Sequence, residues 1–143
     1  MFDKIMVPID GSKCSWKALD YAINIAKAFN SKLILVHVVQ QPILPFTDNV
    51  GGTFIDRVIE GLTEQGREIL RRASDIVKEQ GLDYEVILEI GQPADTIVIL
   101  TERFKVDLVV IGSKGISRVK RFLLGGTSDA VVHHVKCPVL IVK

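Results

Sequence analysis

The sequence of 143 residues has no long hydrophobic run and no marked excess of one charge. No apolar segment reaches the ~18 residues of a membrane span, and the start MFDKIMVPID is too short in apolar residues for a signal peptide. Eighteen lysines and arginines face seventeen aspartates and glutamates, which argues against a surface devoted to nucleic acid. We therefore expect a cytoplasmic protein that binds neither membranes nor nucleic acid.

Residues that build disulfide frameworks and metal centres are also few. The two cysteines, Cys14 and Cys137, lie far apart and have no CxxC spacing, so free thiols are expected. The three histidines, His37, His133 and His134, share no metal-ligand spacing with each other or with an acid. His37 falls in an apolar run and is predicted to be a hydrogen-bonded core residue. No metal site made by side chains alone is predicted.

Motifs of dedicated catalysis are missing as well. The sequence has no G-x-S-x-G elbow, no kinase catalytic loop, no Walker A loop and no dinucleotide G-x-G-x-x-G fingerprint. No paired carboxylates lie near its glycine-rich stretch, and nothing identifies a general base. No catalytic residue is therefore predicted.

The composition, 48% hydrophobic and 24% charged, is ordinary for a globular protein, and the length fits a single domain over residues 1–143. Apolar runs of strand length alternate with amphipathic patterns of helix length. The strands are expected over residues 4–9, 32–39, 84–90, 106–111 and 139–142. The helices are expected over residues 14–30, 53–80, 93–105 and 128–135.

Two segments of this pattern leave alternatives open. Gly61 and Gly66 weaken the longest helix by roughly 1 kcal/mol each relative to alanine, so a bend or break is expected near its start. Residues 40–52, with two prolines and two glycines, form a long connection that suits either a functional lid or a surface insertion.

Alternating strands and helices predict an α/β fold with a five-stranded parallel sheet and helices on both faces. The first and fourth strands both end in glycine-containing turns, at Asp10-Gly11 and Gly112. If both turns serve one ligand, these strands are neighbours where the winding reverses, which gives a Rossmann-like sheet of strand order 3-2-1-4-5. The ligand crevice is then expected at their carboxyl ends.

The stretch after the fourth strand, VVIGSKGISRVKRFLLGGTS, is glycine-rich and basic. Its glycines at 112, 115, 125 and 126 allow backbone N–H groups to approach an anion, and the helix that follows points its amino end at the same place. The stretch carries four basic residues, Lys114, Arg118, Lys120 and Arg121. Because Lys114 and Arg118 flank the glycines, phosphate contact is expected for at least one of the four, the alternative being a solvated face. The stretch predicts a nucleotide phosphate site, the alternative being that its glycines only make turns.

Taken together, VPIDGS, LVHVV, VVIGSKG, LLGGTSDAVV and CPVLIVK resemble the universal stress protein family, specifically its ATP-binding branch, over nearly the whole chain. The resemblance implies an adenine nucleotide alpha hydrolase-like fold that binds ATP or AMP, with Mg²⁺ or Mn²⁺ on the phosphates near Asp10. It also implies a homodimer. Pairing of the apolar last strand, Val139 to Val142, with its copy would cover an exposed sheet edge.

The resemblance also implies which residues contact each part of the nucleotide. Adenosine lies beside Pro8, Ile9 and Asp10, with Asp10 on a ribose hydroxyl and the backbone of Val38 on the adenine edge. Ile111 and Gly112 line the opening, and the phosphates are held by Gly115, Gly125, Gly126 and Thr127. The charge argument above adds Lys114 and Arg118 to this end of the site.

Two of these positions carry alternatives. Gly126 stands where the family has serine or threonine, and the first hydroxyl follows at Thr127, which predicts weaker or altered phosphate binding. An aspartate before Gly-Ser also serves as a turn former, so Asp10 has a structural interpretation too.

The function that the resemblance implies is a nucleotide-dependent signalling or stress-response module. One alternative is an enzyme on the same scaffold that slowly hydrolyses ATP or transfers nucleotidyl groups, and another is a nucleotide-free module for protein interactions. A phospho-acceptor receiver domain is disfavoured, because it needs an aspartate after the third strand, where this chain has Ile90-Gly91.

Overall fold

The protein folds around a parallel five-stranded sheet of order β3-β2-β1-β4-β5, as the sequence predicts. The computed structural model describes residues 1–42, 52–113 and 126–143. The strands are β1 (Lys4–Pro8), β2 (Lys32–Gln40), β3 (Tyr84–Gly91), β4 (Leu108–Gly112) and β5 (Val139–Val142). The helices are α1 (Lys13–Phe29), α2 (Gly52–Glu79), α3 (Pro93–Arg103) and α4 (Gly126–His134).

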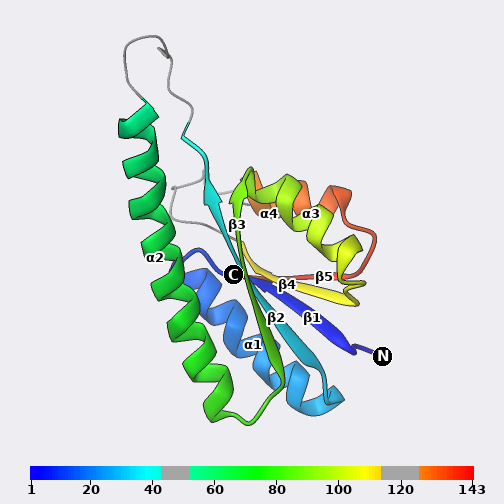
Figure 1. The fold of residues 1–143 in the computed structure, drawn as a ribbon. Coiled ribbons are helices and arrows are strands. Elements are labelled where there is room, and N and C mark those ends of the chain that lie inside the picture. The colour runs from blue at the N-terminus through cyan, green and yellow to red at the C-terminus, as the bar shows by residue number, and fades with distance from the viewer. Residues whose placement is uncertain (43–51, 114–125) are drawn as a thin grey trace.

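Helices cover both faces of the sheet, which confirms the predicted layers. Figure 1 shows α1 and α2 on one face and α3 and α4 on the other. Successive side chains of β1 point to opposite faces of the sheet and so contribute to both cores. Ile5 and Val7 pack with α1 and α2, while Met6 packs with α3 and α4. All three side chains are fully buried. No helix in the described ranges is long and apolar enough to cross a bilayer.

Some expected boundaries were wrong, and local geometry explains them. Strand β4 begins at Leu108 instead of Val106, because the chain first turns through the left-handed conformation at Lys105 (φ 52°). Helix α2 runs as one element through Gly61 and Gly66, so the expected break does not occur. Residues 43–51, most of the expected long connection, lie outside the described residues.

Strands β1 and β4 lie side by side but pair only briefly. Strand β1 pairs with β2 along its whole length, whereas its register with β4 is limited to Ile5↔Leu108 and Met6↔Val109. Pairing therefore stops before the carboxyl ends of β1 and β4, at the switch point where parallel sheets bind ligands. The sheet is open at the predicted place.

Candidate functional site

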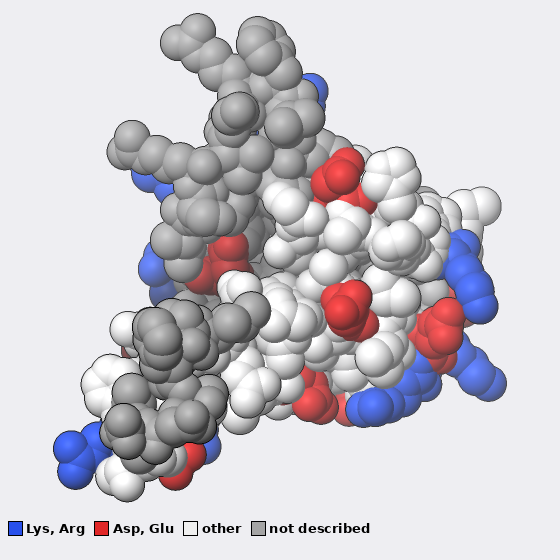
Figure 2. All heavy atoms as spheres, turned by 90° about the horizontal axis from the view of Figure 1, so that it is seen from above, with Lys and Arg blue, Asp and Glu red and all other residues white. Residues whose placement is uncertain are grey.

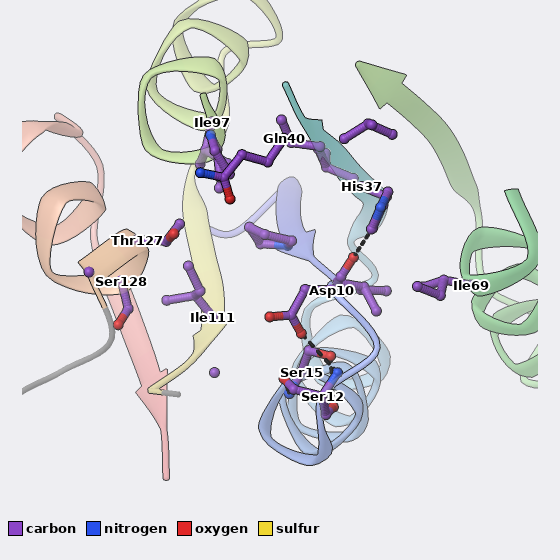
Figure 3. Close-up of a pocket in the computed structure, with 18 of the residues that line it drawn as sticks. Asp10, Ser12, Ser15, His37, Gln40, Ile69, Ile97, Ile111, Thr127 and Ser128 are labelled. Carbon is purple, nitrogen blue, oxygen red and sulfur yellow. Dashed lines mark hydrogen bonds between the residues drawn. The ribbon is translucent and has the colours of Figure 1, made fainter. Parts of the chain in front are cut away.

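A cavity of about 500 Å³ lies at the carboxyl edge of the sheet, a size typical of small-molecule sites. Viewed from this side, most of the described surface is uncharged, several aspartate and glutamate side chains are scattered over it, and lysine and arginine side chains lie at the periphery (Figure 2). Figure 3 shows side chains from both helical layers converging on the cavity. Its lining comprises Pro8, Ile9, Asp10, Ser12, Ser15, Val36, His37, Val38, Val39, Gln40, Leu62, Gln65, Ile69, Pro93, Ile97, Ile111, Gly112, Gly126, Thr127 and Ser128.

Asp10 follows β1 and forms the turn that was one of its two expected roles, while its contact with a ribose hydroxyl stays a prediction. Its Oδ1 accepts a hydrogen bond from the Ser12 N–H at 2.9 Å, which closes the turn through Gly11 at φ +88°. Ser12 then caps α1, where its side chain accepts from the Ser15 N–H at 3.3 Å. The Asp10 side chain also lines the cavity, and its Oδ2 has no hydrogen-bond partner among the described residues.

Gly112, at the end of β4, allows this strand to approach α1 closely. A Cβ at this position would lie 2.7 Å from the carbonyl carbon of Cys14, so no larger residue fits without backbone movement. Ile111 and Gly112 both line the cavity.

The amino end of α4 forms the wall beyond β4. Gly126, Thr127 and Ser128 line the cavity, and the buried Ser128 hydroxyl donates to the Ser113 carbonyl at 3.3 Å. This bond ties the start of α4 to the end of β4. The helix therefore presents its amino end, which favours negative charge, to a cavity that Asp10 reaches from β1.

Val38 lies in the part of β2 that extends beyond the end of β1. Its peptide groups point to the side of β2 on which β1 pairs earlier in the strand. The Ile9 N–H donates to the Val36 carbonyl at 2.7 Å, so residue 36 and, by alternation, residue 38 turn their peptide groups toward β1. Because β1 ends at Pro8, no strand of the described residues lies beside Val38 on that side. Its N–H and C=O therefore face the cavity.

His37 is hydrogen-bonded as expected, but its predicted place in the core was wrong. The ring is half-buried and lines the cavity, because β2 extends past the end of β1. Its Nδ1 lies 2.7 Å from the Ile9 carbonyl oxygen. Since a carbonyl only accepts, Nδ1 carries the proton in this pair.

Several lining residues have no counterpart in the predicted site. Leu62, Gln65 and Ile69 come from α2, and Pro93 and Ile97 come from α3. Leu62, Ile69 and Ile97 are apolar residues of amphipathic helices, and the helical pattern alone could not show that they lie at the cavity. No sequence signal distinguished Gln65, or Gln40 at the end of β2.

Four predicted phosphate contacts, Lys114, Gly115, Arg118 and Gly125, lie outside the described residues. Within the described ranges no three potential ligands gather for a metal ion. Asp10 is the acidic side chain of the described lining, which fits an ion held mainly by ligand phosphates.

The cysteines take no part in the described lining, and both are free thiols, as expected. Burial raises the pKa of the Cys137 thiol, and the negative charge of Asp107 adds to this. The thiol therefore stays protonated at neutral pH.

Comparison with known proteins gives one family. The model of the universal stress protein family matches residues 1–143. Universal stress protein YxiE of Bacillus subtilis is 36% identical, with all of both chains covered. Universal stress protein UspA from Lactobacillus plantarum has the same fold, with a TM-score of 0.90 at 22% identity over 99% of this chain and 98% of that one. A universal stress protein solved in complex with cAMP is 32% identical, with a TM-score of 0.74 over 99% of this chain and 97% of the other. The chain belongs to the universal stress protein family.

Proposed function

We propose that the cavity binds an adenine nucleotide, ATP or AMP, and that the protein is a stress-response module whose signalling depends on that nucleotide. The observation that carries the proposal is the convergence of three groups on one cavity: the Asp10 carboxylate, the Val38 peptide groups and the amino end of α4. The cAMP bound to a 32% identical relative supports an adenine nucleotide as the ligand class.

The adenine base is assigned to the β2 side of the cavity. An N–H and a C=O from Val38 match the N1 acceptor and the 6-amino donor of adenine, whereas guanine reverses donor and acceptor at these two atoms. Pro8 and Ile9 supply apolar surface beside the base. This arrangement favours adenine over guanine nucleotides.

The ribose and phosphates are assigned to the β1 and α4 sides. Oδ2 of Asp10 accepts a hydrogen bond from a ribose hydroxyl, and the phosphates lie toward Gly112, Gly126 and Thr127 at the amino end of α4. Lys114, Gly115, Arg118 and Gly125 complete the phosphate contacts in this proposal. A Mg²⁺ or Mn²⁺ ion would be carried by the phosphates, with Asp10 as the nearest protein ligand.

The same proposal includes a cytoplasmic homodimer of single-domain chains. Strand β5 is the sheet edge beside β4, and Val139, Leu140 and Ile141 are only half-buried within one chain. Pairing of β5 with its copy would cover this apolar edge. A conformational change of the segment from Gly112 to Thr127 on nucleotide binding would then alter the surface presented to a protein partner.

Calorimetric titration of the protein with ATP and Mg²⁺, AMP, cAMP and GTP tests the proposal. Saturable binding of adenine nucleotides is expected, with GTP at least roughly tenfold weaker because its base opposes the Val38 groups. Product analysis after incubation with ATP is expected to show nucleotide retained without turnover. Absence of adenine nucleotide binding, equal binding of GTP or multiple-turnover hydrolysis would overturn it.

A further inference from the structure

The carbonyl of Ile9 would normally receive its hydrogen bond from Val38 if the β1–β2 ladder continued. In a parallel pair, a residue that donates to position 36 of the neighbouring strand accepts from position 38. Ile9 donates to the Val36 carbonyl at 2.7 Å, so its own carbonyl is the next acceptor in the series. The Val38 N–H is therefore the donor expected at that oxygen.

The structure places a different donor there. The His37 imidazole reaches from β2 to Ile9, and its Nδ1 lies 2.7 Å from the Ile9 oxygen, as the dashed line in Figure 3 marks. Among the described residues, no bond from the Val38 N–H to this oxygen is formed. We propose that His37 is a positioning residue: its side chain replaces the Val38 N–H at the Ile9 carbonyl, ends the ladder and leaves that N–H for the nucleotide base.

Gly66 of α2 keeps the imidazole in this place. A Cβ on Gly66 would lie 2.5 Å from Cδ2 and 3.0 Å from Nε2 of His37, so only glycine lets the helix pass over the ring. Gly66 is buried within α2, where glycine otherwise costs roughly 1 kcal/mol relative to alanine. The ring is thus held between the Ile9 carbonyl and the α2 backbone.

The hydrogen bond of His37 also affects which base the cavity selects, a point that rests on the proposed function. With His37 in place, the Val38 N–H is available to N1 of adenine. Without a donor at position 37, the Val38 N–H turns to the Ile9 carbonyl and the ladder gains one bond. The base then loses its N1 contact while the fold is retained.

Hydrogen exchange in the nucleotide-free protein tests the ladder directly. The Val38 amide is expected to exchange far faster than the Val36 amide, which lies within the paired part of β2. Nitrogen NMR is expected to find the His37 proton on Nδ1. Equal protection of the two amides in the free protein, or a proton on Nε2 alone, would overturn the proposal.

Two nearly isosteric variants separate the hydrogen bond from packing. In His37→Asn the side-chain N–H reaches the position of Nδ1, whereas His37→Leu has similar size and no donor. Fast Val38 exchange is expected to persist in His37→Asn and to be lost in His37→Leu. Both variants lose contact with Gly66 alike, so identical exchange in the two would contradict the assignment.

Titration with ATP and 1-deaza-ATP, which lacks the N1 acceptor, then tests the base contact. The wild-type protein and His37→Asn are expected to prefer ATP roughly tenfold, and His37→Leu to bind both about equally. An unchanged preference in His37→Leu would refute the base contact. If the wild-type protein binds no adenine nucleotide, the proposed function is refuted. Amide exchange still tests the role of His37 in the ladder in that case.

Discussion

Gly66 of α2 lies so close to His37 of β2 that a Cβ on the glycine would come within 2.5 Å of the imidazole. Gly61, less than two turns earlier on the same helix, has no described atom within 4 Å of its corresponding Cβ position. The two glycines look alike in the sequence, yet packing requires a glycine only at position 66.

This difference predicts opposite effects of the same substitution. Gly66→Ala is expected to lower the free energy of unfolding by about 1–2 kcal/mol, because overpacking against His37 exceeds the gain in helix propensity. Gly61→Ala is expected to raise it by up to about 1 kcal/mol. Urea unfolding of the two variants measures both effects, and shifts of the same sign would contradict the packing argument.

The close approach of Gly112 to Cys14 gives a second stability prediction. Gly112→Ala is expected to lower the free energy of unfolding by about 1–3 kcal/mol, because the added Cβ meets backbone atoms of α1 that cannot turn aside. Gly126→Ala is the matched control, since no described atom lies within 4 Å of its Cβ position. Thermal unfolding that ranks the two variants equally would refute the assigned role of Gly112.

Gly126 also bears on phosphate affinity. Gly126→Ser places a hydroxyl at the start of α4, where the Cβ meets no described atom. We expect ATP binding to tighten by roughly fivefold while adenosine binding stays unchanged, because the added donor can contact only phosphate. Calorimetry with the two ligands measures the ratio. Equal tightening for adenosine would place residue 126 away from the phosphates.

Strand β5 provides a test of the proposed dimer. The carbonyls of Pro138 and Val142 accept bonds from the N–H groups of Val109 in β4 and of Ser113 just after it. The alternating Ile141 N–H therefore points away from the sheet. Ile141→Pro removes this outward donor without breaking the β4 ladder. Sedimentation is expected to find a wild-type dimer and a largely monomeric variant.

Two results would count against this assembly. A monomeric wild-type protein at high concentration would refute the dimer itself. A variant that remains folded and dimeric would show that β5 is not the contact strand.

Much of the fold could be predicted because each element carries its own pattern. The apolar runs of β1, β2 and β4 and the amphipathic helices fixed the α/β class. The glycine turns after β1 and β4 indicated that these strands are neighbours, which the sheet order confirms. The boundary at Leu108 could not be predicted, because the turn geometry at Lys105 decides it.

The site residues at the ends of strands could be predicted from the sequence, whereas those whose positions depend on the placement of a helix could not. One cavity is lined by Pro8, Ile9, Asp10, Val38, Ile111, Gly112, Gly126 and Thr127, and their contact with a nucleotide stays a prediction. Gln65 and the exposed side of His37 were missed, because their positions follow from how far α2 and β2 extend beyond the sheet edge. The phosphate role of Lys114, Gly115, Arg118 and Gly125 stays a prediction.

Binding of ATP and of 2′,3′-dideoxy-ATP shows whether Asp10 holds the ribose of a nucleotide in this cavity. Asp10→Asn keeps the acceptor that closes the turn to Ser12 and loses the second carboxylate oxygen. The wild-type protein is expected to prefer ATP by at least about tenfold, because a hydroxyl bonded to a carboxylate is lost in the dideoxy analogue. In Asp10→Asn this preference is expected to fall to a few-fold or less. An equal preference in both proteins, measured by calorimetry, would contradict the account.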